Sequence, residues 1–95
     1  MVTYRKIDYL AAVLCMTAIR QYGMPLDYVP LALRTPEICM AAVQENGWAL
    51  EFVPEHLKTP EICMAAVTQN GLALEFVPLD LRTPELIQEA QKTKT

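Results

Sequence analysis

The sequence contains no serine and only one histidine, His56. Both features bear on catalysis, because a nucleophilic site of the usual kind pairs a hydroxyl or thiol with a histidine base and an orienting partner. The three glycines are isolated, so there is no glycine-rich loop to cradle a phosphate group. No stretch approaches the ~20 consecutive apolar residues that span a bilayer. From these missing features we expect a protein that is not an enzyme and does not span a membrane.

Basic residues are also scarce: eight lysines and arginines stand against eleven aspartates and glutamates, giving a net charge of −3. They are scattered along the chain, so no basic patch would attract nucleic acid. The three cysteines are an odd number, which is typical of free thiols in a reducing compartment and predicts a cytoplasmic protein. Arg5 and Lys6 precede an apolar stretch, as in a signal peptide. Asp8 interrupts that pattern, so we expect this segment to belong to the mature protein.

The dominant feature of the sequence is an internal repeat of 24 residues. Residues 35–58 and 59–82 are identical at 18 of 24 positions, and residues 11–34 keep eight positions of the same pattern. Such self-similarity indicates a repeat architecture, in which each unit buries its apolar surface against its neighbours. The two near-identical units differ only at Gln44/Thr68, Glu45/Gln69, Trp48/Leu72, Glu55/Leu79, His56/Asp80 and Lys58/Arg82.

The first half of the unit carries strong helix signals. Thr35 is a good N-cap, Pro36 suits the first helical position, and Glu37 places a negative charge where the helix dipole favours it. We expect a helix of about 11 residues, 36–46, in which Gly47 supplies the left-handed residue after the carboxyl end. The same signals recur one unit later, and a third Thr-Pro-Glu begins at Thr83.

The second half of the unit is less decisive. Residues 50, 53 and 57 are apolar with helical spacing, but Pro54 disfavours helix at the preceding residue. We expect a short helix over residues 48–53, then a proline-led turn of α or 3₁₀ type reaching Leu57. A strand over residues 50–53, as in leucine-rich repeats, is the competing interpretation. The first unit departs most here, since Tyr22 and Pro25 replace an asparagine and an alanine.

Residues 38–43 are apolar on every side of the expected helix, which is typical of a buried helix. A stack of helical hairpins explains this composition, because each first helix is covered by both neighbours. The sequence therefore predicts an all-α, single-domain protein: a short right-handed α-solenoid of three 24-residue helical-hairpin repeats with a C-terminal capping helix. The expected parts are an N-terminal cap at 1–10, repeats at 11–34, 35–58 and 59–82, and a C-terminal cap at 83–95.

The repeated phrase Ala-Val-x-x-Asn-Gly-x-Ala-Leu, at residues 42–50 and 66–74, supports a more specific assignment. It resembles the short tandem helical repeats of an uncharacterised bacterial family described as a domain of unknown function. The resemblance covers nearly the whole chain and implies an all-helical array. It implies no activity, ligand or catalytic residue.

A cysteine followed by a methionine recurs once in each unit: Cys15-Met16, Cys39-Met40 and Cys63-Met64. Thiolate and thioether ligands suit copper(I), so one interpretation is a metal- or redox-responsive ladder. Neighbouring helices lie roughly 8–10 Å apart, however, which is far for ligands of one ion. Cysteine and methionine are also common core residues. We therefore expect packing here, with no metal and no cofactor.

The positions that differ between near-identical units are the best pointer to function, because we expect shared residues to serve packing and the six differing ones to be exposed. Trp48 stands out, since tryptophan is enriched at interface hot spots. Met24 and Leu72 occupy its position in the other units, forming either an exposed apolar stripe or a contact between units. The predicted interaction surface comprises Gln44, Glu45, Trp48, Glu55, His56, Leu72 and Leu79.

Together these patterns favour a noncatalytic protein–protein interaction scaffold with no catalytic residues. The expected partner is a protein not yet identified, with no role for nucleic acid or membrane, and with homodimerisation through exposed repeat ends as a further option. The alternative function is a metal- or redox-responsive protein that uses the repeated Cys-Met positions.

Overall fold

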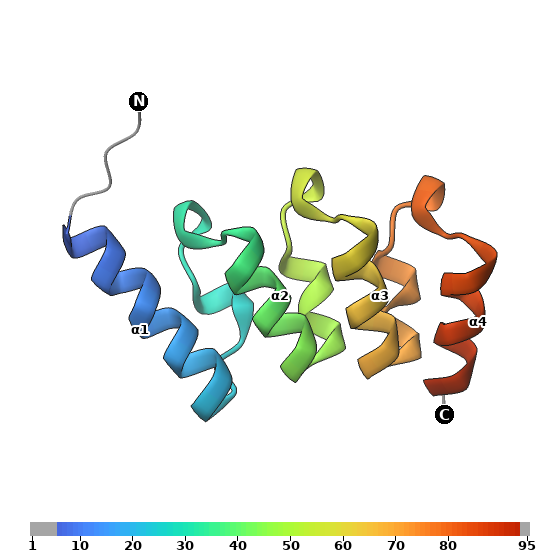
Figure 1. Cartoon of the computed structure of the whole chain (residues 1–95), viewed down its shortest axis with the longest axis horizontal. Helices are drawn as coiled ribbons and strands as arrows, with labels where there is room; N and C mark the ends of the chain where they lie inside the picture. The colour runs from blue at the N-terminus through green and yellow to red at the C-terminus, as the bar shows by residue number, and fades with distance from the viewer. Residues whose placement is uncertain (1–5, 94–95) are drawn as a thin grey trace.

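The computed structural model describes residues 6–93, and over these residues the chain is helical without a strand (Figure 1). The strand considered for residues 50–53 is therefore wrong. The α-helices are α1 (Lys6–Tyr22), α2 (Pro36–Glu45), α3 (Pro60–Gln69) and α4 (Pro84–Thr93). Short 3₁₀ helices lie between them: η1 (Leu26–Tyr28), η2 (Leu31–Leu33), η3 (Gly47–Phe52), η4 (Glu55–Leu57), η5 (Gly71–Phe76) and η6 (Leu79–Leu81).

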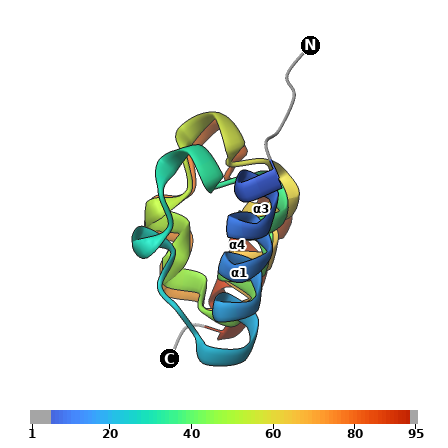
Figure 2. The same ribbon diagram turned by 90° about the vertical axis from the view of Figure 1, so that its left-hand side faces the viewer.

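The elements form two layers. The four α-helices stand side by side in chain order, each packing against the next (Figure 1). In Figure 2, which looks along this row, the α-helices lie on one side of the molecule and the 3₁₀ segments on the other. Helix η3 packs on α2 and α3, and η5 packs on α3 and α4, so each six-residue 3₁₀ helix contacts both its own α-helix and the following one. The apolar face of each element is thereby covered along the row.

The helix starts follow the sequence signals. The hydroxyl of Thr35 accepts a hydrogen bond from the Ile38 amide at 3.3 Å, and that of Thr59 accepts one from Ile62 at the same distance. Thr83 caps α4 in the same way through the Leu86 amide, at 3.2 Å. The predicted N-caps are confirmed, because the Thr-Pro-Glu chemistry acts within one turn and needs no distant partner.

The predicted role of Gly47 is wrong. Helix α2 ends at Glu45, and Asn46 adopts an extended conformation with φ of −154°. Its side-chain oxygen accepts a hydrogen bond from the Trp48 amide at 3.1 Å and so starts η3. Among the described residues only Gly23, after α1, has a positive φ, of 66°. The chain turns at Asn46 without a left-handed residue, so Gly47 is needed for another reason.

That reason is a close approach between units. A Cβ atom on Gly47 would overlap the carbonyl oxygen of Ala66 and lie 3.1 Å from the Cβ and amide nitrogen of Asn70. Both neighbours belong to the carboxyl end of the α3 segment, and the nearest atoms are backbone atoms that cannot swing aside. Glycine at position 47 therefore lets η3 lie against the next helix.

The rest of the unit matches the expected order of elements. The short second helix is η3, of 3₁₀ type, and the proline-led turn is η4. In the first unit the corresponding segment, η1, has only three residues, as the proline at position 25 suggested. Helix α1 runs back to Lys6, within the predicted N-terminal cap. The parts of the predicted caps at residues 1–5 and 94–95 lie outside the described residues.

The core runs continuously along the row. Five of the six residues expected to form an all-apolar helix, 38–43, are buried, and Met40 is half-buried. Equivalent residues of the other units join them, from Ile19 near one end to Ala90 near the other. Within the described part of the chain, no polar or charged residue is buried as a whole, although the Lys58 side chain is only 7% exposed. The residues of this core are thus held by apolar packing.

Candidate interaction surfaces

The seven residues of the predicted interaction surface are all exposed, but they do not form one patch. Gln44 and Glu45 end α2, and Trp48 and Leu72 lie in the first turns of η3 and η5. Glu55, His56 and Leu79 belong to η4 and η6, whose curls lie along the opposite long edge of the molecule (Figure 1). The structure therefore divides the predicted surface into a Trp48 edge and a second edge formed by η4 and η6.

Trp48 is both exposed and in contact with the next unit, so the two interpretations of its role are each partly correct. Its side chain keeps 37% of its surface exposed. Its indole ring also meets the Phe76 ring edge-on, with the ring centroids 5.7 Å apart and the planes at 70°. This aromatic pair holds the indole in place while part of the ring remains open to a partner.

Lys58, one of the six differing positions, was expected to be exposed, and that expectation is wrong. Its side chain is only 7% exposed and forms a 2.7 Å ion pair with Glu55. The Lys58 ammonium also donates a hydrogen bond to the carbonyl oxygen of Phe76 at 3.0 Å. Phe76 lies 18 residues further along, in the next unit, so Lys58 ties two units together. A long aliphatic stem lets lysine cross the junction with its charge still paired.

Arg34, the basic residue at the same position in the first unit, also donates a hydrogen bond to a carbonyl oxygen of the next unit. The guanidinium of Arg34 donates to the carbonyl oxygens of Val29 at 2.8 Å and Phe52 at 3.0 Å, the latter in the next unit. Arg82 donates to Val77 at 2.9 Å. Position 34/58/82 differs between the near-identical units because lysine and arginine both serve this structural role, not because it lies on the surface.

This use of the basic residues leaves the middle of the molecule acidic outside. Residues 21–91 contain ten acidic residues and only three basic ones, a formal charge of −7. Those three are the arginines and the lysine bound to backbone carbonyls at the unit junctions. Their charges are therefore bound to the backbone, and the formally charged residues that are exposed in this region are aspartates and glutamates.

A hollow of about 360 Å³ lies on the Trp48 edge between the first two units. Met24, Leu26 and Phe52 contribute apolar lining, and the indole of Trp48 joins them. Glu45 and Glu51, both exposed, complete it. Met24 and Trp48, which occupy the same position in successive units, both line this hollow. The hollow combines an aromatic ring, apolar walls and two carboxylates.

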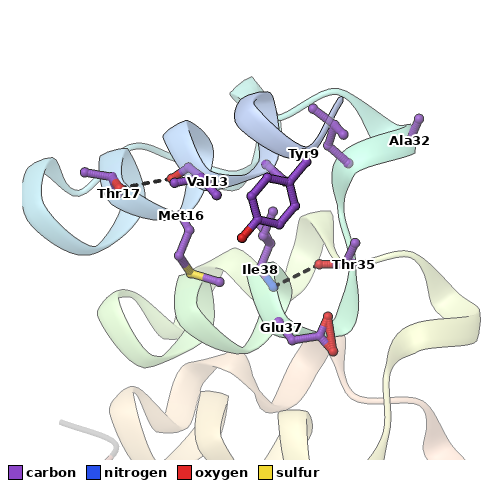
Figure 3. A pocket seen from close by; sticks show the side chains of 10 residues that line it. Tyr9, Val13, Met16, Thr17, Ala32, Thr35, Glu37 and Ile38 are labelled. Atoms are coloured by element: carbon purple, nitrogen blue, oxygen red, sulfur yellow. Dashed lines mark hydrogen bonds between the residues drawn. The ribbon is translucent and has the colours of Figure 1, made fainter. Parts of the chain in front are cut away.

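A second opening, of about 450 Å³, is a groove between α1 and α2 (Figure 3). Tyr9, Val13 and Met16 line it from α1, and Ile38 lies opposite on α2, with Glu37 beside it. Leu33 of η2 also lines it. The groove is almost wholly apolar. The sequence interpretation did not include these residues, although the run of uncharged residues 9–19 was visible in it.

The cysteines are placed as core residues. Cys39 and Cys63 are fully buried, and Cys15 is half-buried. Burial raises the pKa of the Cys39 thiol from its usual 9.0 to about 11, opposed in part by the charge of Arg34. Burial raises the pKa of Cys63 as well. Over the residues the structure describes, no three His, Cys, Asp or Glu side chains come together as metal ligands would.

These features define a class: an all-helical protein whose elements recur every 24 residues and whose openings lie between units. The chain belongs to the family of the domain of unknown function DUF4116, whose model matches residues 35–82, the two near-identical units. This confirms the resemblance to a family of unknown function. No curated protein and no solved structure gives a significant match. None of the helices in residues 6–93 is long and apolar enough to cross a membrane.

Proposed function

We propose that this protein is a noncatalytic protein–protein interaction scaffold that binds a basic segment of its partner on the Trp48 edge. The observation that carries the proposal is the hollow formed by Met24, Trp48 and Phe52 with the carboxylates of Glu45 and Glu51. Tryptophan and arginine are the residues most enriched at interface hot spots, and a hollow beside an exposed indole is a suitable anchor point.

The chemistry of the hollow favours a lysine or arginine side chain next to an apolar one. Glu45 and Glu51 supply two negative charges, and the three basic residues of the surrounding region are bound to backbone carbonyls. An indole face attracts cations by about 0.5–1 kcal/mol at exposed sites. The acidic surface also accelerates the encounter with a basic partner, which makes binding sensitive to salt.

We propose further that the units form a short right-handed α-solenoid of three repeats with α4 as its capping helix. The 24-residue spacing of the α-helices and their packing in chain order support this description. Solenoids present extended surfaces on which a partner contacts several units at once. The Trp48 edge is such a surface, since it continues from Met24 through Trp48 to Leu72.

The metal- or redox-responsive alternative has less support. Thiolate is the form of cysteine that binds metals and reacts with oxidants. The Cys39 thiol is covered by its neighbours, and this burial raises its pKa to about 11, so the thiol stays protonated at neutral pH. Cys63 is equally buried.

Selection of binders from a random-peptide library tests the proposal and does not require the partner to be identified first. We expect the selected peptides to carry lysine or arginine beside apolar residues, and their affinity to fall as salt is raised. The sharpest variant is Trp48→Leu, because Leu72 already occupies this position in the next unit. It removes the indole ring and its edge-on contact with Phe76 but keeps an apolar side chain at this position.

Charge reversal provides the second arm. Glu45→Lys and Glu51→Lys should each weaken binding about tenfold or more, whereas Glu61→Lys, an equally exposed carboxylate in the first turn of α3, should leave it unchanged. Selection of acidic peptides, or equal weakening by Glu61→Lys, would show that the hollow is not the binding site.

A further inference from the structure

Helix α1 exposes an apolar face on the side away from α2. Leu10 and Leu14 are exposed, and their spacing of four residues places them on one face of the helix. Val13 is exposed beside them, but it also lines the α1–α2 groove. No charged residue interrupts residues 9–19. The exposed ring of Tyr9 continues this surface to the rim of the α1–α2 groove (Figure 3).

The equivalent position in the following units identifies what this face is built to contact. Leu14 is 69% exposed, whereas Ile38 and Ile62, which are 24 and 48 residues further on, are 2% exposed each. Leu86, 72 residues on, is also 2% exposed. Every later unit buries this side chain, and each later α-helix has a preceding α-helix packed beside it. Leu14 therefore lies on a helix-packing surface with no preceding α-helix beside it among residues 6–93.

Helix α4, at the opposite end of the row, has polar residues where the earlier helices have apolar ones. Ile19, Val43 and Val67 share one position and are fully buried, but the fourth residue in this series is Gln91, which is exposed. Gln88 likewise replaces the methionines of the earlier units and is exposed. The outer side of α4 is therefore polar, as expected at an end that faces water.

We infer that the apolar face of α1 pairs with the same face of a second copy of this chain, forming a two-fold symmetric dimer. Head-to-tail stacking would bury Gln88 and Gln91 against leucines without hydrogen-bond partners, which costs free energy. Pairing α1 with α1 instead matches leucine with leucine. It also keeps the acidic middles of the two chains, residues 21–91, apart, and it closes after two copies because the contact is the same on both sides.

Measurement of mass in solution against concentration tests the dimer. The wild-type chain should approach twice its 10.7 kDa mass as concentration rises. Leu14→Glu places two carboxylates at the two-fold axis and should weaken dimerisation at least about 100-fold. Leu79→Glu is the matched control, because Leu79 is 79% exposed on η6 and lies apart from α1. It should dimerise as the wild type does, and both variants should keep wild-type helicity.

The orientation is tested by cross-linking. In a Cys15→Ala background, Leu14→Cys should form a disulfide-linked dimer on mild oxidation, since the two sulfur atoms meet near the axis, while Leu79→Cys in that background should not. A monomer at all concentrations, growth beyond two copies, or a dimer unaffected by Leu14→Glu would each overturn the inference. The α1 face lies apart from the Trp48 hollow, so these results are independent of partner binding.

Discussion

The first unit, residues 11–34, and the second, residues 35–58, reach the same arrangement through different local chemistry. Gly23 follows α1 in the left-handed conformation, and no atom lies within 4 Å of the place where its side chain would begin. Gly47 has an ordinary φ but is pressed against α3. One glycine is required by the backbone turn and the other by the neighbour. The comparison shows that glycines at the same position of a repeat can have different structural roles.

Alanine substitution separates the two roles and should give the largest effect. Gly47→Ala forces its new methyl group into the Ala66 carbonyl, so it should lower the free energy of unfolding by about 3 kcal/mol. Gly23→Ala has open space and bears only the left-handed backbone cost, about 1 kcal/mol. Chemical denaturation of both variants measures the difference. An equal or larger loss in Gly23→Ala would contradict the assigned roles.

The junctions of the two units offer a second comparison. Arg34 and Lys58 each donate to a carbonyl oxygen 18 residues ahead, at 3.0 Å in both cases. Lys58→Met keeps the length of the side chain but removes the charged donor, and should cost about 2 kcal/mol of unfolding free energy. Arg34→Met should cost a similar amount.

Lys58→Arg is the control for this junction. Arg34 already fits the equivalent place and adds a bond to the carbonyl of Val29, so the arginine at position 58 should be neutral or slightly stabilising. Thermal unfolding of the three variants tests the comparison. If Lys58→Met proves as stable as Lys58→Arg, the lysine is not a tie between units.

The sequence predicts what depends on neighbours along the chain and fails where distant atoms decide. The threonine caps and the short proline-bounded helices follow from chemistry within a few residues, and both are present. Gly47 and Lys58 were misinterpreted because the groups that constrain them, in Ala66 and Phe76, are 19 and 18 residues away. Local patterns carry no information about those contacts.

The sequence likewise does not show which residues of the predicted interaction surface lie together. Each chosen residue is exposed, but variation between near-identical units does not by itself identify a surface position, because Lys58 also varies and its side chain is only 7% exposed. Whether two exposed positions lie together depends on the path of the chain, and the η3 segment carries it from one long edge to the other between Trp48 and Glu55 (Figure 1). The α1 face was missed although the leucine at position 14 aligns with two isoleucines, because only the packing reveals which of them has a neighbour.

The smallest expected effect concerns the cysteines, which distinguish the units without changing stability at neutral pH. Cys15 in the first unit is half-buried, whereas Cys39 and Cys63 are fully buried. A thiol reagent added to the folded protein at pH 8 should modify Cys15 alone, and the other two should react at the rate at which the protein unfolds. Mass spectrometry of the modified peptides resolves the three sites. Rapid modification of Cys39 in the folded state would instead support the metal- or redox-responsive function.

The same burial predicts the pH dependence of stability. The Cys39 thiol loses its proton near pH 9 when unfolded but only near pH 11 when folded. Below pH 9 both states hold the proton, so this thiol contributes no pH dependence to the free energy of unfolding. Between pH 9 and 11 the folded state binds more protons than the unfolded state, and stability should fall by up to about 1.4 kcal/mol per pH unit. Cys39→Ala should show a shallower fall over this range, and an unchanged slope would place the thiol in contact with solvent.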